Sequence, residues 1–162
     1  MIKTLSTEKL FDEEQVRDFK IAIVKTDYHN ELVDSLEKKC IETLMQQGVP
    51  ENNIKTFVAP GSWEIPLMSK AIAESKVFDA IITFGVIIKG DTLHFEMIAN
   101  ESARALMQIS IDYSMPIILE VLAVFNLEQA KERTSSDDKN KGIEAASSVL
   151  KALIEIKKIK KL

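Results

Sequence analysis

The chain has 162 residues, 46% of them hydrophobic, and a formal net charge of −4. This length is sufficient for one domain with its own core, and the acidic balance gives no general attraction to nucleic acid or to anionic membranes. No apolar run has the length of a membrane span or a signal-peptide core, and Cys40 is the single cysteine. We therefore expect a cytoplasmic protein whose thiol is a small core residue.

Residues 1–18 show no sustained hydrophobic period, so we interpret them as an N-terminal arm outside the core, followed by a single domain at 19–162. A compact β-branched run at 21–24 predicts the first strand. The next segment has apolar residues at every fourth position and stops at Gly48, as a helix does at its C-terminus. These positions are Leu32, Leu36, Cys40 and Leu44.

Three further apolar runs predict strands, at 54–58, 80–88 and 117–122. Helical spacing follows each of them, in segments that contain Ile65, Met68 and Ile72, then Ile98, Ser102, Ala105 and Ile109, then Ile143, Ala146, Leu150, Leu153 and Ile156. Continuous hydrophobicity within the runs favours strands covered on both faces, hence a parallel sheet. The pattern predicts an α/β protein, a three-layer α/β/α sandwich with a four-stranded parallel sheet, whose ligands bind at the carboxyl ends of the strands.

The stretch APGSWEIP, residues 59–66, follows the second predicted strand. Pro66 is tolerated only near a helix start, so a helix must begin close upstream, and Ser62 is a good N-cap for it. Trp63 can stack on a flat ligand, and Glu64 can accept hydrogen bonds from a polyol or an amine. The simpler alternative is a capped helix in which Trp63 belongs to the core and Glu64 favours the helix dipole.

The stretch GVIIKGDTLHFE, residues 85–96, likewise joins a strand end to a helix start, and we expect the third strand to end at Gly90. Asp91 and Thr92 lead into a helix whose N-terminus is suited to binding an anion. His94 lies in this turn, and the imidazole of a free histidine, with a pKa near ~6.5, exchanges protons at neutral pH. The alternative is that His94 only caps the helix.

Two more strand ends carry candidate ligands. Tyr28 follows the first strand and offers a flat face to a heterocycle, whereas Arg133 lies after the fourth and can bind a phosphate through two parallel hydrogen bonds. A solvated loop at 133–142 is the simpler reading of the charges around Arg133. No metal-ligand spacing, Ser-His-Asp order or nucleotide phosphate loop is present in the sequence.

Taken together, APGSWEIP, GVIIKGDTLHFEMIANESA and LEQAKERTSSDDKNKGIEAA closely resemble the lumazine synthase family, in register from about Phe19 to about Leu153. The resemblance implies a flavodoxin-like sandwich of the lumazine synthase type. It also implies condensation of 5-amino-6-(D-ribitylamino)uracil with 3,4-dihydroxy-2-butanone 4-phosphate to 6,7-dimethyl-8-ribityllumazine, in riboflavin biosynthesis and without a cofactor or metal.

Carried over by position, the resemblance implies that His94 transfers protons and that Arg133 binds the phosphate. Lys141 and Glu144 match a further lysine and acid of the site. The implied substrate-binding residues are Tyr28, Ser62, Trp63, Glu64, Val86, Ile87, Ile88, Asp91, Thr92, Leu119, Arg133 and Lys141.

The family places each site between neighbouring subunits, with Leu119 and Arg133 presented to the neighbour's His94. The resemblance thus implies a homopentamer or a larger homo-oligomer, up to a capsid-like shell, with riboflavin synthase as a candidate partner. Three positions depart from the family pattern: Asp27 replaces a common arginine, Leu119 a phenylalanine and Asp137 a lysine. Two alternatives stay open, a non-catalytic cage that binds flavin or lumazine and a riboflavin synthase of the same fold.

Overall fold

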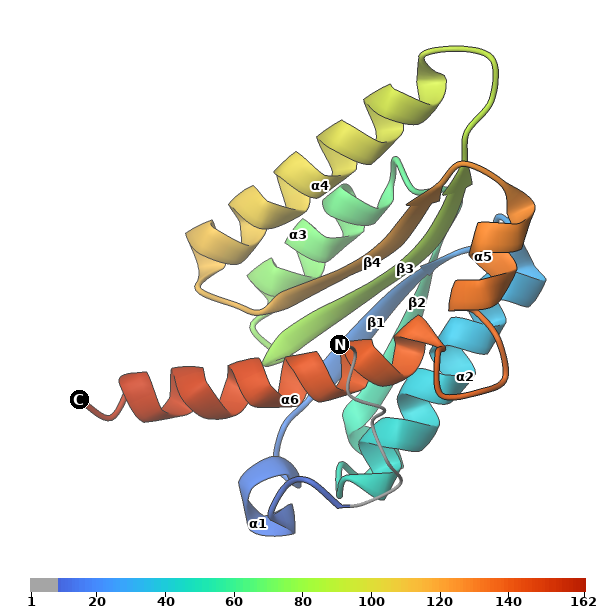
Figure 1. Ribbon diagram of the computed structural model, residues 1–162. Helices are drawn as coiled ribbons and strands as arrows, with labels where there is room; N and C mark the ends of the chain where they lie inside the picture. Colours follow the sequence, from blue (N-terminus) through green and yellow to red (C-terminus); the bar gives the residue numbers. More distant parts are fainter. Residues whose placement is uncertain (1–8) are drawn as a thin grey trace.

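The computed structural model describes residues 9–162. Its elements confirm the predicted alternation of strands and helices (Figure 1). In chain order they are α1 (Glu13–Val16), β1 (Ile21–Thr26), α2 (Asn30–Gln46), the 3-10 turn η1 (Glu51–Asn53), β2 (Ile54–Ala59), α3 (Ile65–Ser75), β3 (Ala80–Ile88), α4 (His94–Tyr113), β4 (Ile117–Val124), α5 (Leu127–Arg133) and α6 (Lys141–Ile159).

The four strands form one sheet in the order β2-β1-β3-β4, and every neighbouring pair is parallel. β1 and β3 are central, and nearly all of their residues are buried, which explains their continuous hydrophobicity. The edge strands β2 and β4 are only partly buried. All four carboxyl ends meet at one edge of the sheet, where ligands of such folds bind.

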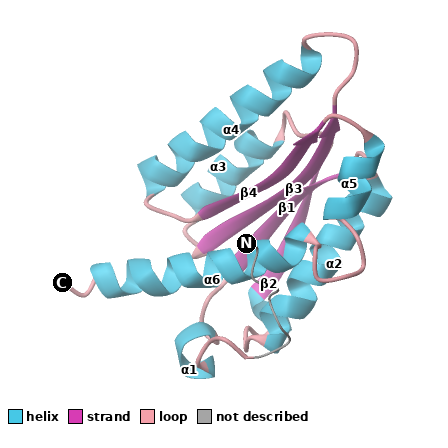
Figure 2. Ribbon diagram, in the orientation of Figure 1, coloured by secondary structure: helices cyan, strands magenta, loops and turns pink. Residues whose placement is uncertain are grey.

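Helices cover both faces of the sheet, with α3 and α4 on one side and α2 and α6 on the other (Figure 2). Successive strand residues point to opposite faces, so each face has its own core. Ile23 and Ile82 pack under α2 and α6, whereas Ala22 and Ile81 pack under α3 and α4. Cys40 is fully buried in the first of these cores, as predicted, and burial raises the pKa of its thiol.

Two helices were not predicted. α5 has seven residues, too few to show a period, and is recognisable in sequence only by Asn126, whose side chain caps it by accepting from the Gln129 N–H. α1 lies in the segment that was expected to remain outside the core. That expectation is wrong for Val16, which is fully buried in the core on the α2 and α6 side.

Within residues 9–162, no helix combines the length and the apolar character that crossing a bilayer requires.

Candidate active site

A cavity of about 900 Å³ lies at the carboxyl ends of β1, β2 and β3. Most of the predicted site residues line it, from three separate segments of the chain, together with neighbours such as His29, Phe95 and Met97 that the sequence did not single out as site residues. The predicted residues in its wall are Tyr28, Ser62, Trp63, Glu64, Val86, Ile87, Ile88, Thr92 and His94.

Tyr28 follows β1 and presents its ring to solvent at the cavity mouth, with 65% of the residue exposed. Its carbonyl accepts a hydrogen bond from the Thr26 hydroxyl at 3.1 Å. The next residue, His29, has left-handed backbone geometry (φ 57°), and its ring lies edge-on to Tyr28, with 4.6 Å between the ring centres. The chain thus turns sharply after β1, which places an exposed aromatic face beside the cavity.

The turn from β2 into α3 holds Ser62, Trp63 and Glu64. Ser62 was expected to cap α3, and this is wrong: the helix begins at Ile65, its N-cap position is Glu64, and no side chain makes the cap hydrogen bond. Instead the Ser62 carbonyl accepts from the Ser102 hydroxyl of α4 at 3.2 Å. The Ser62 hydroxyl packs against Gly85 of β3, where an added Cβ would come within 2.7 Å of it.

The structure also tests the sequence interpretation of Trp63 and of Pro66. Trp63 is 55% exposed, so the alternative that placed it in the core is excluded for the single chain. Pro66 is the second residue of α3, as its missing N–H requires.

β3 contributes backbone as well as side chains to the cavity. Its pairing with β1 ends at Phe84, whereas its pairing with β4 continues to Ile88. Among the described residues, the β1-side edge of Val86, Ile87 and Ile88 therefore has no strand partner. All three residues line the cavity. The N–H groups of Ile81 and Lys89 bond to the β4 side, so alternation along the strand directs the N–H and C=O groups of Val86 and Ile88 to the unpaired edge, where a planar ligand with hydrogen-bonding edges can reach them.

The turn after β3 leads to His94, the first residue of α4, and both Asp91 and Thr92 are exposed in it. The N-cap residue makes no side-chain cap hydrogen bond, and the Thr92 hydroxyl accepts from the His94 N–H at 3.4 Å. A helix N-terminus is in general suited to binding an anion. Thr92 and His94 line the cavity, whereas Asp91 is not part of its wall. The alternative that His94 only caps the helix is wrong, because Leu93 occupies the N-cap position.

Three predicted residues lie away from this cavity. Leu119 is exposed on the edge strand β4, Arg133 ends α5, and Lys141 begins α6. The Arg133 Nη1 donates to the Gln129 carbonyl at 3.0 Å, and Lys141 forms an ion pair with Glu144. A single chain therefore does not bring Arg133 and His94 to one ligand.

The sequence is similar to those of known proteins over most of its length. The family model for 6,7-dimethyl-8-ribityllumazine synthase matches residues 18–157. A 6,7-dimethyl-8-ribityllumazine synthase of Leuconostoc mesenteroides subsp. mesenteroides is 38% identical over 143 residues, which cover 88% of this chain and 92% of the relative. This chain belongs to the lumazine synthase family. The resemblance read from the three motifs is thereby confirmed.

In this lumazine synthase family member, the carboxylate of Asp137, one of the three positions expected to depart from the family pattern, is hydrogen-bonded within its own loop. Its Oδ1 accepts hydrogen bonds from the Ser135 hydroxyl at 2.6 Å and from the Lys139 N–H at 2.9 Å. These bonds, that from Ser135 first, lower the pKa of Asp137. The carboxylate of Asp137 therefore stabilises the loop that contains it.

Among residues 9–162 of this lumazine synthase homologue, no group of three or more His, Cys, Asp or Glu side chains is placed to hold a metal ion.

Proposed function

We propose that this protein is a 6,7-dimethyl-8-ribityllumazine synthase of riboflavin biosynthesis whose sites are shared between neighbouring copies of the chain. The observation that carries the proposal is the division of the predicted residues. The aromatic, backbone and histidine groups line one cavity, whereas Leu119, Arg133 and Lys141 belong to β4, α5 and α6 and are absent from its wall. A cavity completed by the β4 side of a second copy would contain all of them.

In this proposal, Tyr28 and Trp63 stack on the pyrimidine ring and the free edge of β3 at Val86–Ile88 reads its polar groups. Ser62 and Glu64 hold the ribityl chain. These groups fix the nucleophilic amine of the uracil beside the second substrate, and such alignment of two reactants supplies a large part of the acceleration.

The phosphate of the butanone substrate binds at the open N-terminus of α4, near Thr92, with Arg133 of the neighbouring copy. His94, at the same helix end, moves protons during imine formation and loss of phosphate. The products are the lumazine, phosphate and water, and no redox step or cofactor enters this scheme.

The direct test incubates the purified protein with both substrates and follows lumazine fluorescence. Formation faster than the spontaneous condensation is expected, and it should depend on both substrates. A rate no higher than the spontaneous one would instead indicate a cage without catalysis. Riboflavin formed from lumazine alone would indicate a riboflavin synthase.

Sharing of the site has its own test, in which two impaired variants are mixed. His94→Ala and Arg133→Ala chains, unfolded and reassembled together, form interfaces of which roughly a quarter carry both wild-type groups. We expect about that fraction of wild-type activity to return, while each variant reassembled alone stays low. Sedimentation of the wild type should show a pentamer or a larger assembly, and an isolated monomer would contradict the proposal.

A further inference from the structure

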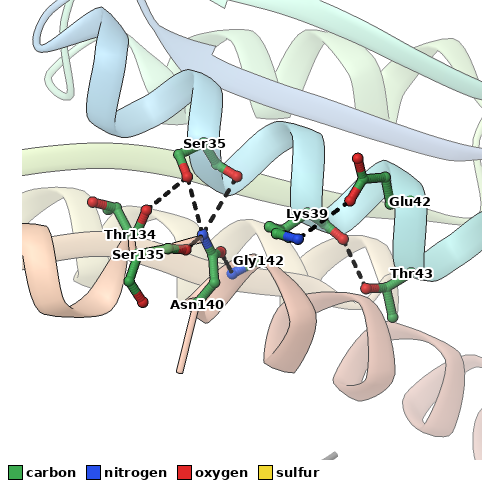
Figure 3. A network of polar contacts seen from close by, with 8 residues as sticks. All are labelled: Ser35, Lys39, Glu42, Thr43, Thr134, Ser135, Asn140 and Gly142. Carbon is green, nitrogen blue, oxygen red and sulfur yellow. Dashed lines mark hydrogen bonds and ion pairs between the residues drawn. The ribbon is translucent and has the colours of Figure 1, made fainter. Parts of the chain in front are cut away.

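The loop between Arg133 and Lys141 is fastened at both ends to one residue of α2, Ser35 (Figure 3). The Ser35 hydroxyl donates to the Thr134 carbonyl at 2.6 Å and accepts from the Asn140 Nδ2 at 3.2 Å. Thr134 directly follows Arg133, and Asn140 directly precedes Lys141. The two cations are therefore each one residue from the same anchor.

Asn140 is buried, with 1% of its surface exposed, and both ends of its side chain are used. Its Nδ2 also donates to the Ser135 carbonyl at 2.6 Å, across the loop. Its Oδ1 accepts from the Gly142 N–H at 2.8 Å and so caps α6. One side chain thus joins α2, the loop and the first turn of the helix that carries Lys141.

α2 and α6 also approach each other closely at this point. A Cβ on Gly142 would come within 2.1 Å of the Leu36 carbonyl, so only glycine permits this contact. At the other end of the loop, the buried Thr134 hydroxyl donates to the Ala130 carbonyl at 3.0 Å, which fixes the end of α5. The anchor is therefore rigid on both sides.

We propose that Ser35 and Asn140, which we call the loop latch, are positioning residues that set the separation and direction of Arg133 and Lys141. The inference rests on the proposed function, because it assigns these two cations to the substrates. Neither latch residue reaches the cavity at the strand ends. The latch acts only through the backbone on either side of the loop.

Ser35→Ala is the primary test, because it removes the hydroxyl and leaves the Asn140 cap on α6 in place. We expect the KM for the butanone phosphate to rise about fivefold, with kcat and the KM for the ribitylaminouracil changed less than about twofold. Ser35→Thr retains the hydroxyl and should restore the wild-type KM. Calorimetric titration of the wild type and both variants with inorganic phosphate measures anion binding without catalysis, and its Kd should follow the same pattern.

Ser110→Ala is the matched control. This hydroxyl is also half-buried and donates to a backbone carbonyl, that of Met115, at 2.7 Å, but it lies at the far end of α4. The Ser110→Ala variant should have unchanged kinetic constants and should lose about as much unfolding free energy as Ser35→Ala. If Ser35→Ala fails to fold, Asn140→Asp serves instead, since it keeps the cap acceptor and loses the hydrogen bonds that the Asn140 Nδ2 donates to Ser35 and to the Ser135 carbonyl.

The outcomes separate the two proposals. A wild type that makes lumazine, with Ser35→Ala unchanged in KM and in phosphate Kd, would overturn the latch and leave the function intact. A wild type that makes no lumazine but binds phosphate more tightly than Ser35→Ala would overturn the function and retain the latch. An equal rise in the KM for the butanone phosphate in Ser35→Ala and Ser110→Ala would show that Ser35 is a general structural residue and would overturn the inference.

Discussion

The ammonium group of Lys89 lies 5.6 Å from the centre of the Phe125 ring and 3.3 Å from a carboxylate oxygen of Glu96. Phe125 in turn packs against Phe95, with 6.4 Å between the ring centres. Lys89 directly follows β3, and Glu96 lies in the first turn of α4. The ion pair between them therefore joins the two ends of the segment that carries Thr92 and His94.

Lys89→Met retains the aliphatic stem of Lys89 but removes its charge. Exposed ion pairs and cation–π contacts are each weak, so we expect only a small fall in the free energy of unfolding. The pKa of Glu96 is lowered first by a hydrogen bond to its own backbone and then by Lys89, so removing Lys89 should raise that pKa part of the way to its ordinary value. Urea unfolding at fixed protein concentration measures the first effect, and a carboxyl NMR titration the second. An unchanged pKa of Glu96 would contradict the pairing.

His94→Ala tests the proton-transfer role at the start of α4. We expect kcat to fall roughly 100-fold or less, because the two substrates also condense unaided, while the KM for each substrate stays within a few-fold. Steady-state lumazine fluorescence provides both constants. The control is His29→Ala, the second histidine of the cavity wall, for which kcat should fall far less. Equal losses in the two variants would remove His94 from its assigned role.

Gly85→Ala tests the contact between β3 and the Ser62 turn. The added methyl group would meet the Ser62 hydroxyl at 2.7 Å, so we expect a loss of about 1–3 kcal/mol in unfolding free energy and weaker binding of the ribitylaminouracil. Adding Ser62→Ala removes the clashing oxygen and should recover most of the stability. Urea unfolding of the two single variants and the double variant forms a mutant cycle. Additive losses would show that Ser62 is not what the methyl group meets.

Glu120 predicts a dependence of stability on pH. Burial on β4 raises its pKa from the ordinary 4.5 to about 7, against an opposing effect of Lys141 and with a contribution from Glu144. A carboxyl whose pKa is raised by folding favours the folded state when protonated, so its contribution is lost as the pH rises from about 4.5 to about 7. Glu120→Gln should therefore be more stable than the wild type at pH 8, by roughly 1–3 kcal/mol, and equal to it near pH 4.

Unfolding free energies at pH 4, 6 and 8 check this expectation, with Glu155→Gln on the exposed side of α6 as the control. The control should change stability by less than about 0.5 kcal/mol. A Glu120→Gln variant that is less stable at pH 8 would mean that Glu120 stabilises the fold through Lys141, contrary to the direction given by burial.

The site could be read from sequence only where residues are close along the chain. Ser62, Trp63 and Glu64 form one turn, and so do Thr92 and His94, so their motifs predicted them together. His29 was not singled out, although it lines the cavity, because its placement depends on a left-handed turn that the sequence does not mark. The role of Ser62 was misjudged for a similar reason: its neighbours Gly85 and Ser102 come from two other elements.

The sequence by itself determined the sheet, because four buried β-branched runs alternating with amphipathic segments leave a parallel α/β sandwich as the arrangement that covers both faces. It also determined the family, through short motifs whose residues act together locally. Only the tertiary structure decided that Ser35 anchors both ends of the loop around Arg133 and Lys141, and that these cations lie apart from the cavity of their own chain. Such contacts join residues about a hundred positions apart, and they depend on the close approach of α2 and α6, which no local pattern encodes.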